Sequence, residues 1–197
     1  MKKYIDLVVV RHDNTSISNR GELEVGNAHL SEEDFWQVKD AAEKLADMAF
    51  NYIAAGATLR MMETLEEIKK TIKIETEECD TRLDSRTNSN GPTNLWPGEH
   101  DDLFLGPDGY HDRAQKILRV LAARKLPNGG KALLVTTAGI IAPLYVLANG
   151  INPVSEDHYS GAVYGRFSPQ PASIHCFRYF LEAGEFRVVT LNEVKNS

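Results

Sequence analysis

The sequence contains very little cysteine. Only two cysteines, Cys79 and Cys176, occur among its 197 residues, and they lie far apart in the chain. This number argues against a disulfide framework and against a four-ligand zinc site. We therefore expect both cysteines to be small buried side chains of a protein in the reducing cytoplasm.

The sequence also lacks an excess of positive charge. It contains 28 acidic and 22 basic residues, which gives a formal net charge of -6. Nucleic acids and anionic membrane surfaces attract basic proteins, so neither is an expected partner. An anionic substrate would require a pocket that is locally positive.

No apolar run in the sequence is long enough to cross a membrane. The longest, residues 140–147, contains Pro143 and covers less than half of the roughly 20 residues that a membrane-spanning helix needs. Residues 5–10 follow two lysines, as in a signal peptide, but this run is too short for one and leads directly into charged residues. We expect a soluble, cytoplasmic protein.

What the sequence does contain is the composition of an ordinary globular protein, with 42% hydrophobic and 25% charged residues. A chain of this length can bury a sizeable core without metal or disulfide support. We therefore expect a single domain over residues 1–197.

Apolar, β-branched runs alternate with amphipathic segments along the chain. We expect strands at residues 5–10, 51–55, 72–76 and 132–135, a closing hairpin at 172–191, and helices at 31–49, 56–72, 113–124 and 138–147. This alternation predicts an α/β fold, a three-layer α/β/α sandwich with a mostly parallel central sheet.

Two segments carry additional expectations. Residues 81–109 are polar and rich in Asn, Gly and Pro, which is typical of a long, lid-like loop. Pro143 lies inside the helix expected at 138–147, and proline removes a helical hydrogen bond and clashes with the preceding turn. We expect this helix to be kinked or to begin late.

The ends of the expected strands carry the residues with chemical potential. The first strand leads into Arg11 and His12, and the strand at 51–55 leads through Gly56 into a helix with Arg60 in its first turn. Ligands bind beyond the carboxyl ends of strands in open α/β sheets, so these side chains can converge there.

Two arginines and a helix amino terminus form a good environment for a phosphate group. The guanidinium group binds phosphate through two hydrogen bonds, and helix amino termini offer unpaired N–H groups. A neutral imidazole nitrogen of His12 can then attack phosphorus and form a phosphohistidine. The alternative is that Arg11 forms a surface ion pair and His12 is a hydrogen-bonded turn residue.

Other candidates at the strand ends carry less information. Thr136 and Thr137 follow the strand at 132–135, where their hydroxyl groups could donate to phosphate, although threonine also favours strands for packing reasons. No cluster has the ligand count of a metal site. The sequence has neither a P-loop nor a Gly-x-Gly-x-x-Gly motif, so we expect no metal and no nucleotide cofactor.

Four segments in order along the chain form a larger pattern. They are Leu7-Val8-Val9-Val10-Arg11-His12-Asp13-Asn14-Thr15, then Leu30-Ser31-Glu32-Glu33, then Arg60 with Thr64 four residues later, and Leu133-Leu134-Val135-Thr136-Thr137-Ala138-Gly139. Together they resemble the histidine phosphatase superfamily, whose members have the phosphoglycerate mutase-like fold. The resemblance covers residues 5–192.

The resemblance also shows where this sequence departs from the family pattern. Thr137 stands where the family has a second pocket histidine, and Asp13 replaces the glycine that follows the first histidine. The family's proton-donating acid would lie near residues 82–86. There Asp84 is the nearest carboxylate, although Ser85 could occupy the acid's own place.

The resemblance implies a function that the residues alone do not specify. It is the metal-independent hydrolysis of a small phosphorylated metabolite through a phosphohistidine at His12, with altered or reduced activity. Arg11, Arg60 and Thr137 would bind the phosphate group, and Asp84 would donate the proton. The alternative, favoured by Thr137 and Asp13, is an inactive pseudophosphatase that binds a phosphorylated ligand or protein segment.

Overall fold

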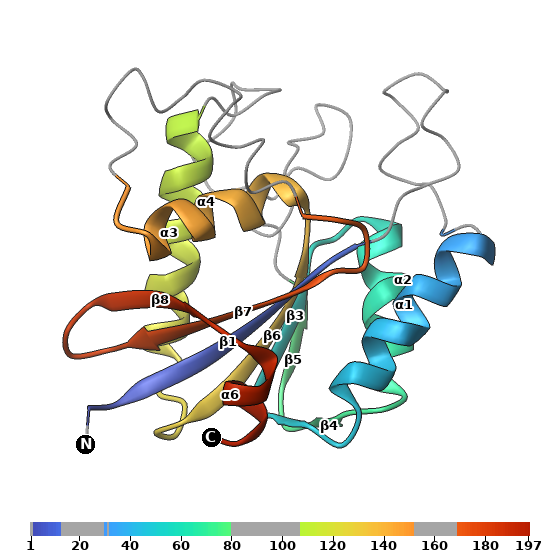
Figure 1. Ribbon diagram of the computed structural model, residues 1–197, viewed down its shortest axis with the longest axis horizontal. Coiled ribbons are helices and arrows are strands. Elements are labelled where there is room, and N and C mark those ends of the chain that lie inside the picture. The colour runs from blue at the N-terminus through green and yellow to red at the C-terminus, as the bar shows by residue number, and fades with distance from the viewer. Residues whose placement is uncertain (1, 13–29, 31, 80–106, 152–168) are drawn as a thin grey trace.

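The computed structural model describes residues 2–12, 30, 32–79, 107–151 and 169–197 (Figure 1). Asp13 and Asp84 lie outside these ranges, as does most of the loop expected at 81–109. The last three residues of that segment instead open helix α3, which begins at Pro107. Proline suits the first turn of a helix, where amide groups have no intrahelical partner.

A six-stranded sheet forms the centre of the structure, with the strand order β5-β3-β6-β1-β7-β8. The strands are β1 (Tyr4–Arg11), β3 (Tyr52–Ala55), β5 (Glu77–Cys79), β6 (Gly130–Thr136), β7 (Ile174–Phe180) and β8 (Glu185–Val189). The first four strands in this order run parallel, and β7 and β8 form an antiparallel hairpin on one side. The expected mostly parallel sheet is confirmed.

Helices cover both faces of the sheet (Figure 1). They are α1 (Glu32–Leu45), α2 (Leu59–Lys69), α3 (Pro107–Ala123), α4 (Ala138–Ala148) and the short α6 (Leu191–Lys195). Helices α1 and α2 pack together against one face, and α3 and α4 pack together against the other. In the described part of the chain, none of the helices combines the length and apolar character that a bilayer span requires.

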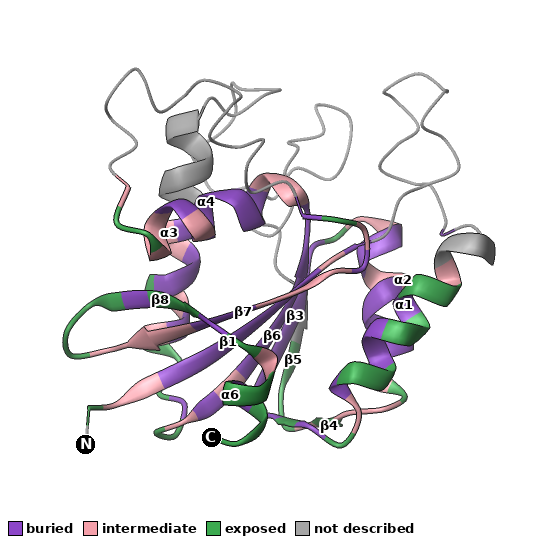
Figure 2. Ribbon diagram, in the orientation of Figure 1, coloured by how far each residue is buried: buried purple, intermediate pink, exposed green. Residues whose placement is uncertain are grey.

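Strand β1 is buried on both faces, as Figure 2 shows for the central strands. Ile5, Leu7 and Val9 face the core that includes α3 and α4. Val8 and Val10 face the core under α1 and α2. An almost continuous apolar run is therefore necessary here, because alternate side chains enter different cores.

Some boundaries differ from the sequence expectation. Helix α1 ends at Leu45 rather than at 49, because Asp47 adopts a left-handed conformation with a φ of 63°. The chain then forms β2 (Ala49–Phe50), which pairs with β4 (Lys73–Ile74) in a separate two-stranded sheet. The strand expected at 72–76 is thus shorter, and the chain continues into β5 of the main sheet.

Helix α4 begins at Ala138, directly after Thr137, so of the two outcomes expected from Pro143, a kink or a late start, the late start is wrong. Pro143 lies in the middle of this helix and is buried. Its place among apolar side chains explains why proline is tolerated: packing against the sheet compensates for the lost hydrogen bond.

Cys176 is buried, as expected, and burial raises the pKa of its thiol to about 12.

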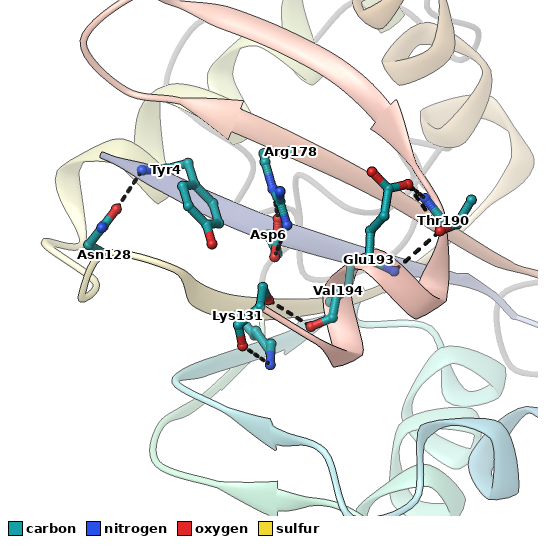
Figure 3. Close-up of polar contacts among 9 residues, drawn as sticks. Tyr4, Asp6, Asn128, Lys131, Arg178, Thr190, Glu193 and Val194 are labelled. Atoms are coloured by element: carbon teal, nitrogen blue, oxygen red, sulfur yellow. Dashed lines mark hydrogen bonds and ion pairs between the residues drawn. The ribbon is translucent and has the colours of Figure 1, made fainter. Parts of the chain in front are cut away.

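The amino end of β1 contains a buried ion pair. Asp6 is fully buried and accepts two hydrogen bonds from the Arg178 guanidinium group of β7, at 2.6 and 2.9 Å (Figure 3). The guanidinium group also lies over the ring of Tyr4, 4.3 Å from its centroid. This arrangement neutralises a carboxylate that the core would otherwise exclude.

Candidate functional site

Three parallel strands deliver the candidate residues to one edge of the sheet. Arg11 is the register partner of Thr136, and Ala55 is that of Val135. The backbone contacts continue past the strand ends, where His12 N donates to Thr136 O at 2.9 Å. Neighbouring strands lie about 4.8 Å apart, so the ends of β3 and β1 flank that of β6 within about 10 Å.

Arg11 and His12 are held at this edge by the body of the fold. The His12 side chain is buried, with 6% of its surface exposed. The Arg11 guanidinium group donates from Nη1 to the Pro169 carbonyl at 2.5 Å, and Arg11 N donates to Ser173 O at 3.1 Å. Both the main chain and the side chain of Arg11 are therefore attached to the segment that leads into β7.

Arg60 lies in the first turn of α2 and is also buried, with 9% exposed. The fully buried Thr64 donates from its hydroxyl group to Arg60 O at 2.8 Å. This bond gives a local physical reason for the spacing of four residues between the arginine and the threonine. The amino end of a helix is positive, which makes it an unfavourable place for a buried cation and a favourable one for an anion.

Helices α2 and α4 begin in the same way. Thr58 and Thr137 are their N-cap residues and have extended backbones, yet neither hydroxyl group forms the usual capping bond. Among the described residues, neither of these buried hydroxyl oxygens has a hydrogen-bond partner. Thr137 is only 4% exposed. Two helix amino termini with unused hydroxyl groups thus follow adjacent strands.

Thr58 was not among the residues predicted from the sequence. A signal was present, because threonine is a favoured N-cap residue and Thr58 stands between Gly56 and Arg60 at a strand-to-helix turn. Asp13 and Asp84 lie outside the described residues, so their expected roles stay predictions. The structure describes Arg11, His12, Arg60 and Thr137, which lie at or beyond the ends of strands that are neighbours in the sheet.

Another histidine, His175 of β7, lies near enough to Arg11 to feel its charge. Its Nδ1 atom is 2.9 Å from the Tyr145 hydroxyl group of α4, and its Nε2 atom is 2.7 Å from Ser173 Oγ. Burial, and then the positive charge of Arg11, lower the pKa of His175 to about 4. The imidazole is therefore neutral at physiological pH.

The described residues offer no group of three or more His, Cys, Asp or Glu side chains that could hold a metal ion. Positive potential at this edge comes instead from arginine side chains and helix amino termini. Both favour oxyanions, and phosphate in particular.

In sequence, the chain matches no protein-family profile and no curated protein. In structure it is similar to a mycobacterial glucosyl-3-phosphoglycerate phosphatase, with a TM-score of 0.67 and 17% identity over 94% of this chain and 97% of that chain. It is also similar to phosphoglycerate mutase from Bacillus anthracis, with a TM-score of 0.62 and 16% identity over 98% and 96% of the two chains.

The chain has the phosphoglycerate mutase-like fold. A further protein with this fold, a phosphoserine phosphatase from Entamoeba histolytica solved with 3-phosphoglyceric acid, gives a TM-score of 0.63 at 14% identity, covering 94% of this chain and 95% of that one. The fold implied by the four sequence segments is thus confirmed. The phosphoglycerate mutase-like fold also places the ends of β1, β3 and β6, with their candidate residues, at one edge.

Proposed function

We propose that this protein is a phosphomonoester hydrolase that uses His12 as its nucleophile. Arg11, Arg60 and Thr137 bind the phosphate group of a small phosphorylated metabolite. The observation that carries the proposal is that two arginines, a histidine and two helix amino termini lie at or just beyond the ends of three adjacent strands. The phosphatases among proteins of the same fold support it.

Burial at this edge supports the binding of an anion. Arg60 and His12 are buried, and so is the hydroxyl group of Thr137, which has no partner among the described residues. A buried donor without an acceptor typically costs about 1–3 kcal/mol. A phosphate oxygen at the amino terminus of α4 would supply that acceptor and would also accept from the first backbone N–H groups of the helix.

The proposed reaction has two steps. In the first, a neutral ring nitrogen of His12 attacks phosphorus, the bond from phosphorus to the ester oxygen breaks, and the leaving oxygen takes a proton from an acid. Asp84 is the acid that the sequence suggests for this role. In the second, water attacks phosphorus and gives a proton to the carboxylate formed in the first step, the bond from phosphorus to the His12 nitrogen breaks, and inorganic phosphate leaves the restored imidazole.

The threonine at position 137 sets an expectation for the rate. A hydroxyl group can donate one hydrogen bond to phosphate, but unlike an imidazolium group it carries no positive charge. Loss of one well-placed donor to developing negative charge typically lowers the rate by about 10²–10³. We therefore expect slow turnover rather than a highly active enzyme.

The deciding experiment is a turnover screen with a panel of phosphomonoesters, including p-nitrophenyl phosphate, in the presence and absence of a chelator. We expect wild-type protein to release phosphate in both conditions and His12→Ala to release none. Full activity of His12→Ala would refute the role of His12. Loss of activity on chelation, with recovery on adding a divalent ion, would refute a metal-independent reaction.

A second candidate function is binding without turnover, and Thr137 is the observation that favours it. The buried hydroxyl group of Thr137 can hold an anion without providing the charge that catalysis uses. A pseudophosphatase of this kind would bind inorganic phosphate in calorimetry yet release no product. Neither Thr137→His nor its combination with Asp13→Gly would then produce turnover.

A further inference from the structure

The chain of hydrogen bonds around His175 has a definite direction. The Ser173 hydroxyl group contacts Gln170 O as well as His175 Nε2, and a carbonyl oxygen can only accept. Ser173 therefore donates to Gln170 and accepts from Nε2–H of His175. Nδ1 is then the unprotonated nitrogen of the neutral ring, and it accepts from the Tyr145 hydroxyl group.

This direction makes His175 unsuitable as a base for Ser173, because the nitrogen that faces the hydroxyl group already carries a proton. The side chain instead connects two elements. Tyr145 belongs to α4, the helix that begins after Thr137, whereas Ser173 belongs to the segment that binds Arg11. His175 thus links the two sides of the proposed phosphate site.

The segment from Pro169 to Ser173 needs such support, because its backbone is strained. Ala172 has a φ of 51°, a conformation that costs a non-glycine residue roughly 1–2 kcal/mol. Such conformations persist only where surrounding contacts enforce them. The turn bond from Ser173 N to Gln170 O, at 3.1 Å, and the His175 contact with Ser173 Oγ provide that enforcement.

The same segment contacts Arg11 through two hydrogen bonds. Pro169 O accepts from the guanidinium group and Ser173 O accepts from the Arg11 backbone, so both contacts depend on the shape of the turn. A change in the turn would move the Pro169 carbonyl, and the N–H donors of the Arg11 guanidinium group would move with it.

We propose that His175 is a positioning residue that holds Arg11 in place for phosphate, by fixing the turn that ends at Ser173. This role rests on the proposed function, because it assumes that Arg11 binds the phosphate group. His175 itself touches neither the substrate nor the reacting atoms. The neutral imidazole of His175 is suited to this role, since a second positive charge near Arg11 would repel the guanidinium group.

The test uses inorganic phosphate as the probe and isothermal titration calorimetry as the measurement, on the full chain. We expect His175→Leu to raise the Kd for phosphate about tenfold, because a displaced Arg11 guanidinium group would lose about one hydrogen bond to the charged phosphate. His175→Gln, which can place an amide donor near the position of Nε2, should recover most of the affinity. Turnover should show the change mainly in KM, because the positioned group already binds the ground state.

Tyr179→Leu is the matched control. Tyr179 lies on the same strand and the same face as His175, since their partners on β1 are Ile5 and Val9, and it contacts Phe186 rather than the Arg11 segment. This variant should lower the melting temperature without changing the Kd. An equal rise in Kd for both variants would show a general loss of stability and would overturn the proposal.

A double-mutant cycle with Arg11→Ala isolates the proposed link. If His175 acts through Arg11, His175→Leu should have no further effect on the Kd once Arg11→Ala has removed the guanidinium group. The same tenfold effect in both backgrounds would overturn the proposal while leaving the phosphatase function intact.

A second measurement keeps the two proposals distinguishable if wild-type protein binds no phosphate at all. In that case the proposed function fails, and nuclear magnetic resonance of the Arg11 Nε–H group decides whether His175 holds this side chain. Faster exchange with solvent in His175→Leu, but not in Tyr179→Leu, would support the positioning role. Unchanged exchange would overturn it.

Discussion

The two ends of β1 place charged residues in different surroundings. At the amino end, the buried Asp6 is matched by the two-pronged hydrogen bond from Arg178, so charge is neutralised within the fold (Figure 3). At the carboxyl end, Arg11 and the buried Arg60 lie near two helix amino termini, and arginine side chains and helix amino termini both favour oxyanions.

The difference teaches how one buried strand can serve both stability and function. A closed ion pair restricts its partners to one geometry and lets a carboxylate exist in the core. At the opposite end, arginine side chains and helix amino termini lie where we propose that an anion binds. We therefore expect substitutions at the amino end to affect unfolding, and substitutions at the carboxyl end to affect binding and turnover.

The largest effect on stability is expected for Asp6→Ala. Removal of the carboxylate leaves the Arg178 charge without its buried partner, which costs about 3 kcal/mol of unfolding free energy, the lower end of the range because Arg178 retains some exposure. Urea denaturation would measure the loss. The control is Asp40→Ala, since its exposed pair with Lys44 should contribute less than about 1 kcal/mol. Equal losses for both variants would contradict the comparison.

Arg60→Ala tests the opposite end of the strand. We expect kcat/KM for a phosphomonoester to fall by about 10²–10³, because a donor to the developing negative charge is lost. Arg60→Lys, which keeps the charge but not the planar fork, should recover only part of the activity. The exposed Arg119→Ala serves as the matched control and should leave kcat/KM unchanged. A large fall in melting temperature without a change in kcat/KM would show that Arg60, like Asp6, serves stability rather than binding.

Thr137→His sharpens the comparison by adding positive charge at the carboxyl end. If this position takes part in catalysis, the imidazole should raise kcat by about tenfold or more, since a well-placed donor contributes roughly 3–4 kcal/mol at best. The gain should appear in kcat more than in KM, because the contact strengthens as charge develops. The pseudophosphatase would be favoured if neither this variant nor its combination with Asp13→Gly turned over substrate. In that outcome both variants would still bind phosphate.

The smallest effect concerns α6, which packs on the sheet near the ion pair (Figure 3). Thr190 and Glu193 form a capping box, and Thr190→Ala should cost about 1 kcal/mol in urea denaturation. Hydrogen bonds from the backbone and side chain of Thr190 lower the pKa of Glu193 below its usual value.

The sign of the pH effect follows from that lowered pKa. Glu193 stabilises the folded state at neutral pH, and the contribution disappears as pH falls through its folded-state pKa, below the normal glutamate range. The pH dependence of stability measured for wild type should therefore be reduced in Glu193→Gln in the acidic range. An unchanged acidic limb would contradict the capping role.

Much of the fold could be predicted because its signals are local. The continuous apolar run of β1 identified a strand buried on both faces, and the hairpin of β7 and β8 was also predicted correctly. The beginning of α3 at Pro107 was not, because its first turn looks like a polar loop in the sequence. Similarly, the left-handed residue Asp47 ended α1 early, and aspartate carries no strong signal for that conformation.

The candidate site was predicted only as a set of residues at strand ends. Arg11, His12, Arg60 and Thr137 follow strands that the structure places next to one another. The connection of His175 to Tyr145 and Ser173 could not be predicted, because 30 residues separate His175 from Tyr145. No local pattern links a helix residue to a strand residue across such a distance.

By itself, the sequence determined the types of the main elements and the chemical groups that follow each strand. Those properties depend on neighbouring residues, through apolar periodicity and the preferences of turns and caps. The tertiary structure alone decided that Asp6 meets Arg178, 172 residues away, and that β6 lies between β3 and β1. The physical reason is that strand order and side-chain packing are cooperative properties of the whole chain, so residues distant in sequence become neighbours only when the complete sheet has formed.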